Sequence, residues 1–122
     1  MYLYLSLHLV LGLLAGATIS ALRWGQLGSS DCPQALTNTP VATISAGAAL
    51  VFVTLALWGD YAFLGMEMAF YGGGLTALGV LLQGFIIHRK LGYYLTLMGL
   101  PLFIACVGVI SKLWLLIAEL LG

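Results

Sequence analysis

The sequence predicts an all-α, polytopic integral membrane protein, a bundle of four transmembrane helices with short loops in a single membrane domain over residues 1–122. The chain is 62% hydrophobic, and its mean hydropathy is +1.12. Only 7% of its residues are charged, whereas a soluble domain carries about 25%. Four apolar stretches each approach or exceed the roughly 20 residues that a spanning helix needs.

The charge balance and the motif content exclude several classes of function. Four Lys and Arg residues oppose four Asp and Glu residues, so no basic patch is present to bind nucleic acid. The sequence contains no GxSxG, HExxH or phosphate-loop motif. We therefore expect the lipid bilayer as a partner, no nucleic acid, no metal site and no catalytic residue, and a non-enzymatic role is favoured over an enzyme.

The first helix is expected over residues 2–22, which contain no Asp, Glu, Lys or Arg. Arg23 and Trp24 follow it as an interfacial pair. Its apolar stretch exceeds the roughly 7–15 residues of a signal-peptide core, which predicts a retained helix. Residues 25–40 are rich in Gly, Ser, Asp, Asn and Pro, a composition typical of an aqueous loop.

The three later helices are expected over residues 41–58, 61–87 and 93–121. Gly59 and Asp60 predict a tight turn between the second and third helices, and residues 88–92 predict a second short connection. Arg23, Arg89 and Lys90 then lie on one side of the membrane and Asp60 on the other. Because basic residues favour the cytoplasmic side, we expect residues 23–40 and 88–92 to be cytoplasmic.

Three ionisable residues lie well inside the expected spans, away from the helix ends: His8, Glu67 and Lys112. At about 1.5 Å per residue, all three lie in the same outer leaflet at similar depth. An ionisable side chain in lipid normally faces a partner or a water-filled cavity, and each of the three shares a helical face with small residues, where membrane helices pack closely. We therefore expect the three side chains to meet inside the bundle.

The leading hypothesis for this group is a transport or protonation site with Glu67 as the titrating residue. A carboxyl group in a low dielectric favours its protonated form, and a nearby ammonium group opposes that effect. Two structural alternatives stay open. Glu67 and Lys112 form a buried ion pair while His8 bonds a backbone carbonyl, or Lys112 extends to the lipid headgroups.

A second polar face on the third helix contains Thr76 and Gln83, which are expected to line a cavity or a protein neighbour. The consecutive glycines Gly72, Gly73 and Gly74 each weaken a helix by about 1 kcal/mol relative to alanine. They predict a hinge at a substrate site, as in transporters; close helix packing explains them equally well.

The sequence thus favours a small transport or ion-translocating protein of the cell inner or plasma membrane, acting as a homo-oligomer or within a larger membrane complex. A non-catalytic accessory subunit of a respiratory or transport complex is one alternative. The other is a redox subunit that holds haem or quinone, although no cofactor is predicted from the residues themselves.

Overall fold

The computed structural model describes residues 2–26, 38–87 and 89–121, and over these ranges the chain is helical with no strand. Its elements are α1 (Tyr2–Gln26), α3 (Thr39–Leu64), α4 (Met66–Ile86), α5 (Arg89–Leu97) and α6 (Gly99–Leu121). All except α5 are long and apolar enough to cross a membrane. The expected all-α class with four candidate membrane spans is therefore confirmed.

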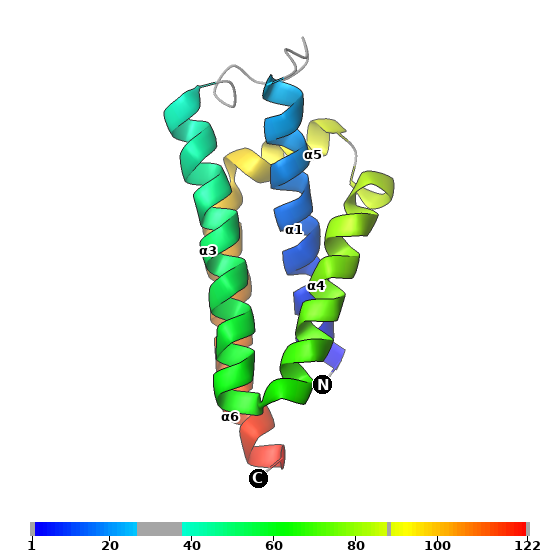
Figure 1. Ribbon diagram of the computed structural model, residues 1–122, viewed down its shortest axis with the longest axis vertical. Coiled ribbons are helices and arrows are strands. Elements are labelled where there is room, and N and C mark those ends of the chain that lie inside the picture. Colours follow the sequence, from blue (N-terminus) through cyan, green and yellow to red (C-terminus); the bar gives the residue numbers. More distant parts are fainter. Residues whose placement is uncertain (1, 27–37, 88, 122) are drawn as a thin grey trace.

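Helix α1 occupies the centre of the bundle and packs against each of the other helices. Figure 1 shows α1 and α4 running upward, α3 and α6 running downward, and α5 lying across the upper end. More than half of the α1 span is buried (56%), against 11–22% of the other three spans. We call the end at which α3 joins α4 the lower end, and the opposite end, with α5, the upper end.

The predicted turn at Gly59 and Asp60 is wrong, because both residues lie within α3. The chain turns instead at Gly65, whose φ of 95° lies in a region that glycine adopts readily and other residues avoid. Its N–H donates to the Tyr61 carbonyl oxygen at 3.1 Å. This correction moves Asp60 from a loop into a membrane-spanning helix.

The stretch expected as one helix over residues 93–121 is divided between α5 and α6. Pro101 lies in the first turn of α6, and it has no N–H to donate to the carbonyl group four residues earlier. The helical pattern is interrupted there, and Met98 joins the two helices. The predicted aqueous loop at residues 25–40 is described only in part, since residues 27–37 lie outside the described ranges.

The contact between α1 and α4 is close because glycines from both helices meet there. A Cβ atom on Gly79 would lie 2.5 Å from the Leu9 carbonyl oxygen, and one on Gly12 would overlap the Thr76 carbonyl oxygen. Only a hydrogen fits at such positions, so the two backbones approach as small residues allow in membrane helices.

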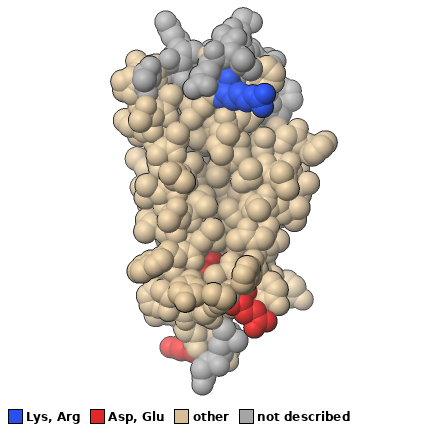
Figure 2. All heavy atoms as spheres, in the orientation of Figure 1, with Lys and Arg blue, Asp and Glu red and all other residues tan. Residues whose placement is uncertain are grey.

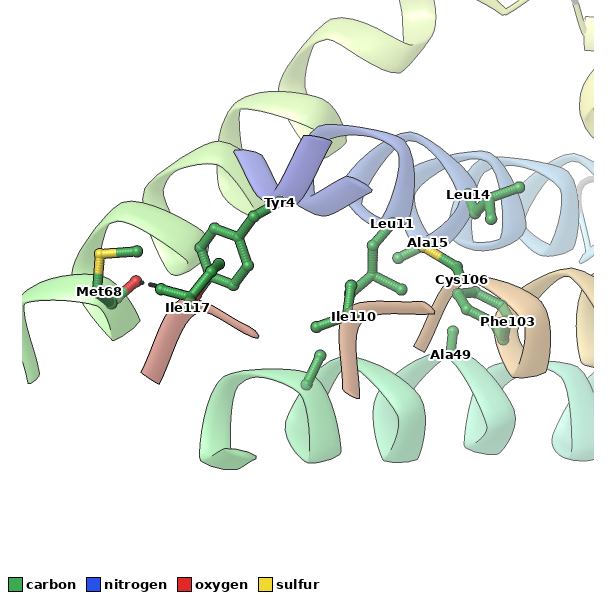
Figure 3. Close-up of a cluster of buried hydrophobic side chains, with 11 residues drawn as sticks. Tyr4, Leu11, Leu14, Ala15, Ala49, Met68, Phe103, Cys106, Ile110 and Ile117 are labelled. Carbon is green, nitrogen blue, oxygen red and sulfur yellow. Dashed lines mark hydrogen bonds between the residues drawn. The ribbon is translucent and has the colours of Figure 1, made fainter. Parts of the chain in front are cut away.

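Apolar side chains fill the interior between α1, α3 and α6, as Figure 3 shows for Leu11, Phe103 and Ile110. Phe103 also stacks on Phe52 of α3, with ring centroids 6.0 Å apart. On the face drawn in Figure 2, basic groups lie toward the upper end and acidic groups toward the lower end. This face is therefore apolar along most of its length, with basic and acidic groups at opposite ends.

Candidate functional site

A buried imidazole–carboxylate pair lies in the lower part of the bundle. His8 of α1 and Asp60 of α3 are both 0% exposed, and His8 Nε2 lies 2.5 Å from Asp60 Oδ2. This is the only ion pair within the ranges that the structure describes. Since charged groups are costly to place inside a membrane protein, their pairing explains how both are accommodated there.

The second ring nitrogen of His8 fixes how many protons the pair shares. His8 Nδ1 lies 2.9 Å from the Tyr4 carbonyl oxygen, and a carbonyl oxygen can only accept a hydrogen bond. Nδ1 must therefore carry a hydrogen and donate it. A hydrogen bond between Nε2 and Asp60 then contains one proton, held either as imidazolium with carboxylate or as imidazole with carboxylic acid.

That single proton keeps the pair neutral. Its loss would leave a net charge of −1 in the interior, and the gain of a second proton would leave a net charge of +1. Burying an uncompensated charge costs several kcal/mol. The closed packing of the surrounding helices therefore suits the neutral pair better than either charged form.

The other carboxylate oxygen of Asp60 accepts a hydrogen bond from α6. Trp114 Nε1 donates to Asp60 Oδ1 at 2.7 Å. The indole ring is held by α3, because it stacks on Phe63 with ring centroids 5.2 Å apart and lies against Gly59. Asp60 is thus fixed from two directions, by an imidazole on α1 and an indole on α6.

Tyr4 and α4 complete the enclosure of the pair. The Tyr4 ring lies against the His8 ring with centroids 4.5 Å apart, and its hydroxyl donates to the Met68 carbonyl oxygen at 3.4 Å (Figure 3). Gly72 of α4 faces the pair directly, because a Cβ atom there would lie 2.7 Å from Asp60 Oδ2 and 2.8 Å from His8 Nε2. All four spanning helices therefore meet at this site.

The chain matches no family model, no curated protein and no solved structure. The case for a function therefore comes from the geometry of this site.

Glu67 and Lys112 do not join His8, so the expected meeting of the three side chains is wrong. Glu67 is exposed at the start of α4, and Tyr71 donates to its Oε1 atom at 3.3 Å. Lys112 is exposed on α6. The physical reason is that Asp60, for which the sequence predicts a turn, lies within α3 and supplies the carboxylate that His8 needs.

Among the other predicted positions, Gly72, Thr76 and Gln83 lie where α4 faces α1, whereas a Cβ atom on Gly73 would meet only Leu57 of α3 and one on Gly74 would meet nothing within 4 Å. Helix α4 continues through Gly72, Gly73 and Gly74 without a break, so their use as a hinge stays a prediction. Thr76 is buried, and its Oγ1 donates to the Gly72 carbonyl oxygen at 2.8 Å. Gln83 is half-buried beside Gly16. The second polar face of α4 therefore packs against α1.

Sequence reasoning missed Asp60 and Trp114. The sequence does contain a signal that Asp60 lies in a helix. No Pro separates the second and third predicted helices, so a continuous helix through Gly59 and Asp60 is compatible with the sequence. The position of Trp114 two residues beyond Lys112 carried no comparable signal, since a tryptophan near a membrane surface is common.

The donor set at this site does not fit haem iron without rearrangement. Both ring nitrogens of His8 are already engaged, one with Tyr4 and one with Asp60. Ligation by His8 would therefore break the bond to Asp60. Within the described residues, no three His, Cys, Asp or Glu side chains come together in a way that could hold a metal ion.

Proposed function

We propose that the protein translocates protons across a membrane, with the His8–Asp60 pair as the exchanging site. The observation that carries the proposal is the fully buried contact of 2.5 Å between His8 Nε2 and Asp60 Oδ2. An ionisable group inside a membrane protein is a functional candidate by default. Here the pair holds one proton that both partners can accept, which is the property a proton relay needs.

Polar groups between the pair and the upper end support a path on that side. Toward the upper end, Thr76 Oγ1 lies 3.4 Å from the His8 carbonyl oxygen. Further up, a cavity of about 210 Å³ is lined in part by the hydroxyl-bearing residues Thr18, Ser45 and Thr96. Polar partners make such a space suitable for water.

A layer of apolar residues separates this cavity from the pair and argues for a gated path. Thr18 follows His8 by ten residues on α1, which is about 15 Å along the helix. Leu11, Leu14 and Ala15 fill that interval and are buried. Proton transfer toward the upper end therefore requires this layer to open, and the closed bundle described here prevents a leak.

The charge distribution supports an orientation for the path. Arg23 lies in the last turn of α1 at the upper end, and Arg89 and Lys90 begin α5 at the same end. Because basic residues gather on the cytoplasmic side, we propose that the upper end is cytoplasmic. The pair then lies nearer the outer surface, from which it is loaded.

Proton flux into sealed vesicles tests this function directly. The purified protein is reconstituted into liposomes that enclose a pH-sensitive dye, and a potassium gradient with valinomycin drives protons inward. We expect flux through the wild type and through Glu67→Gln, and none through Asp60→Asn. The asparagine amide can still donate to His8 Nε2 and accept from Trp114, so this variant keeps the contacts and loses the proton.

Circular dichroism and a monodisperse elution profile serve as the folding control for Asp60→Asn. The proposal is wrong if the wild type gives no flux above empty liposomes. It is also wrong if folded Asp60→Asn conducts as well as the wild type, or if Glu67→Gln alone abolishes the flux.

A further inference from the structure

Lys112 is a basic residue within the membrane-spanning helix α6. Its side chain has no partner in the parts of the chain that the structure describes. It is exposed on α6, and its ammonium group has neither a hydrogen bond nor an ion pair with a described residue. Asp60 is a buried carboxylate at a similar depth in the bundle, but its two oxygens already bond to His8 and Trp114. Since an unpaired charge in hydrocarbon is costly, this position calls for a partner outside the described chain.

The depth of Lys112, its distance along the helices from the lower end of the bundle, follows from the contacts of the buried pair. Trp114 and Asp60 share a level because they are hydrogen-bonded, and Lys112 lies two residues above Trp114, or about 3 Å. Asp60 precedes the turn at Gly65 by five residues, or about 7.5 Å. Lys112 therefore lies about 10 Å inside the lower end of the bundle.

Extension of Lys112 to the lipid headgroups is opposed by the direction of its helix. Side chains leave an α-helix toward its N-terminal end, and α6 begins at the upper end (Figure 1). The Lys112 side chain is thus directed toward the middle of the membrane, away from the nearer lower surface. A carboxylate on a protein partner meets the need more directly than a headgroup does.

An apolar groove lies next to the side of α6 that carries Lys112. It has a volume of about 470 Å³ and is lined by apolar residues of α1, α5 and α6, among them Leu7, Val10, Ala105 and Val109. Lys112 follows Val109 by three residues and Ala105 by seven, so it lies on the same side of α6. The groove therefore has an apolar floor and a single cation at its rim.

Among the residues that the structure describes, no exposed carboxylate of a second, parallel copy supplies the matching anion. Glu67 precedes Gly72 by five residues, and Gly72 lies at the level of Asp60. Glu67 is thus about 7.5 Å below that level and about 10 Å below Lys112. Glu119 follows Trp114 by five residues and lies equally low. In a parallel oligomer, neither exposed glutamate reaches the level of Lys112.

We infer that the groove between α1 and α6 docks a transmembrane helix of a different protein, whose Asp or Glu side chain pairs with Lys112. The apolar floor supplies the packing surface, and the ion pair fixes the depth of the partner helix. Charge complementarity in a low dielectric gives such a contact its specificity. The inference is independent of proton translocation, because Lys112 is not part of the buried pair.

Energy transfer to a synthetic transmembrane helix tests this inference. The probe is a labelled Leu/Ala-rich 23-residue peptide with one Glu about 10 Å from the end that lies at the lower surface, mixed with labelled protein in phosphatidylcholine vesicles. We expect the Glu peptide to associate with the wild type at least about fivefold more tightly than the same peptide with Leu, a preference equivalent to roughly 1 kcal/mol. Lys112→Met should remove this preference, and Lys112→Arg should retain it.

Two further arms separate the alternatives. A peptide with its Glu moved about 10 Å toward the lower surface should lose the preference, because the carboxylate then misses the level of Lys112. Equal association of the Glu and Leu peptides with the wild type overturns the inference. Energy transfer between two labelled copies of the protein that depends on Lys112 also overturns it, in favour of self-association. Proton flux through the same Lys112→Met variant should equal that of the wild type, so the two proposals fail separately.

Discussion

At the scale of single residues, the bond from His8 Nδ1 to the Tyr4 carbonyl oxygen determines the chemistry of the site. It holds one hydrogen on Nδ1 and leaves Nε2 to share the exchangeable proton with Asp60. The same bond orients the imidazole ring along α1. A hydrogen bond to a second ring nitrogen commonly selects the tautomer of a histidine in this way.

Trp114 is expected to contribute to stability through one hydrogen bond. Trp114→Phe keeps most of the aromatic ring on Phe63 and removes the donor to Asp60 Oδ1. A buried acceptor that loses its donor costs about 1–3 kcal/mol, so we expect that decrease in the free energy of unfolding. Denaturation by SDS in mixed micelles, followed by circular dichroism, measures it.

Trp58 offers a matched control for that substitution. It lies on the same helix as Asp60 but is 66% exposed, so Trp58→Phe should change the free energy of unfolding by less than about 0.5 kcal/mol. If the two substitutions lower the free energy of unfolding equally, the hydrogen bond from Trp114 to Asp60 does not stabilise the fold.

The candidate site could be predicted only in part from the sequence. His8 was recognised as an intramembrane ionisable residue, and its face of small residues does lie inside the bundle. Its partner was not recognised, because Gly59 followed by Asp60 is a composition typical of turns. A turn there places Asp60 outside the membrane-embedded segments, so the sequence favours Glu67 as the intramembrane carboxylate. Which carboxylate meets the imidazole depends on tertiary packing, which local composition does not encode.

At the scale of elements, the contact between α1 and α4 depends on glycine. Gly12→Ala would place a methyl group against the backbone of Thr76, which cannot rotate away as a side chain can. The two helices would have to separate, and overpacking of this kind costs about 1–3 kcal/mol. We expect that loss in the free energy of unfolding, measured by the same SDS titration.

Gly47→Ala is the matched control within a helix. A Cβ atom at Gly47 meets nothing within 4 Å, and alanine is intrinsically the better helix former by about 1 kcal/mol. This variant should be as stable as the wild type or more stable. If Gly12→Ala also leaves stability unchanged, the close approach of α1 and α4 is not as described.

The helices themselves were predictable because the hydrocarbon of the bilayer imposes the same two requirements on every span. Backbone groups must be bonded internally, and about 20 apolar residues are needed to cross. The ends of the helices were less predictable. Gly65 ends α3 through a positive φ, whereas the equally turn-like Gly59 lies in the helix against Trp114. The difference between the two glycines arises from what packs against them.

At the scale of the whole molecule, the face drawn in Figure 2 carries basic groups toward the upper end and acidic groups toward the lower end. The proposed orientation can be checked with cysteines that a membrane-impermeant maleimide labels in a Cys32→Ser background. Asn38→Cys at the start of α3 should react only from the cytoplasmic side, and Met66→Cys at the start of α4, which is 59% exposed, only from the outside. The reverse pattern would show that the upper end faces outward.

The proposed function depends on the contact between His8 and Asp60, and nitrogen-15 NMR of labelled histidine probes that contact. The chain has two histidines, so His88→Gln leaves the His8 signals alone. We predict that Nδ1 carries a directly bonded hydrogen, that Asp60→Asn shifts the Nε2 resonance, and that Glu67→Gln does not. An Nε2 resonance that Asp60→Asn leaves unchanged, or that shifts in Glu67→Gln, would show that His8 does not pair with Asp60.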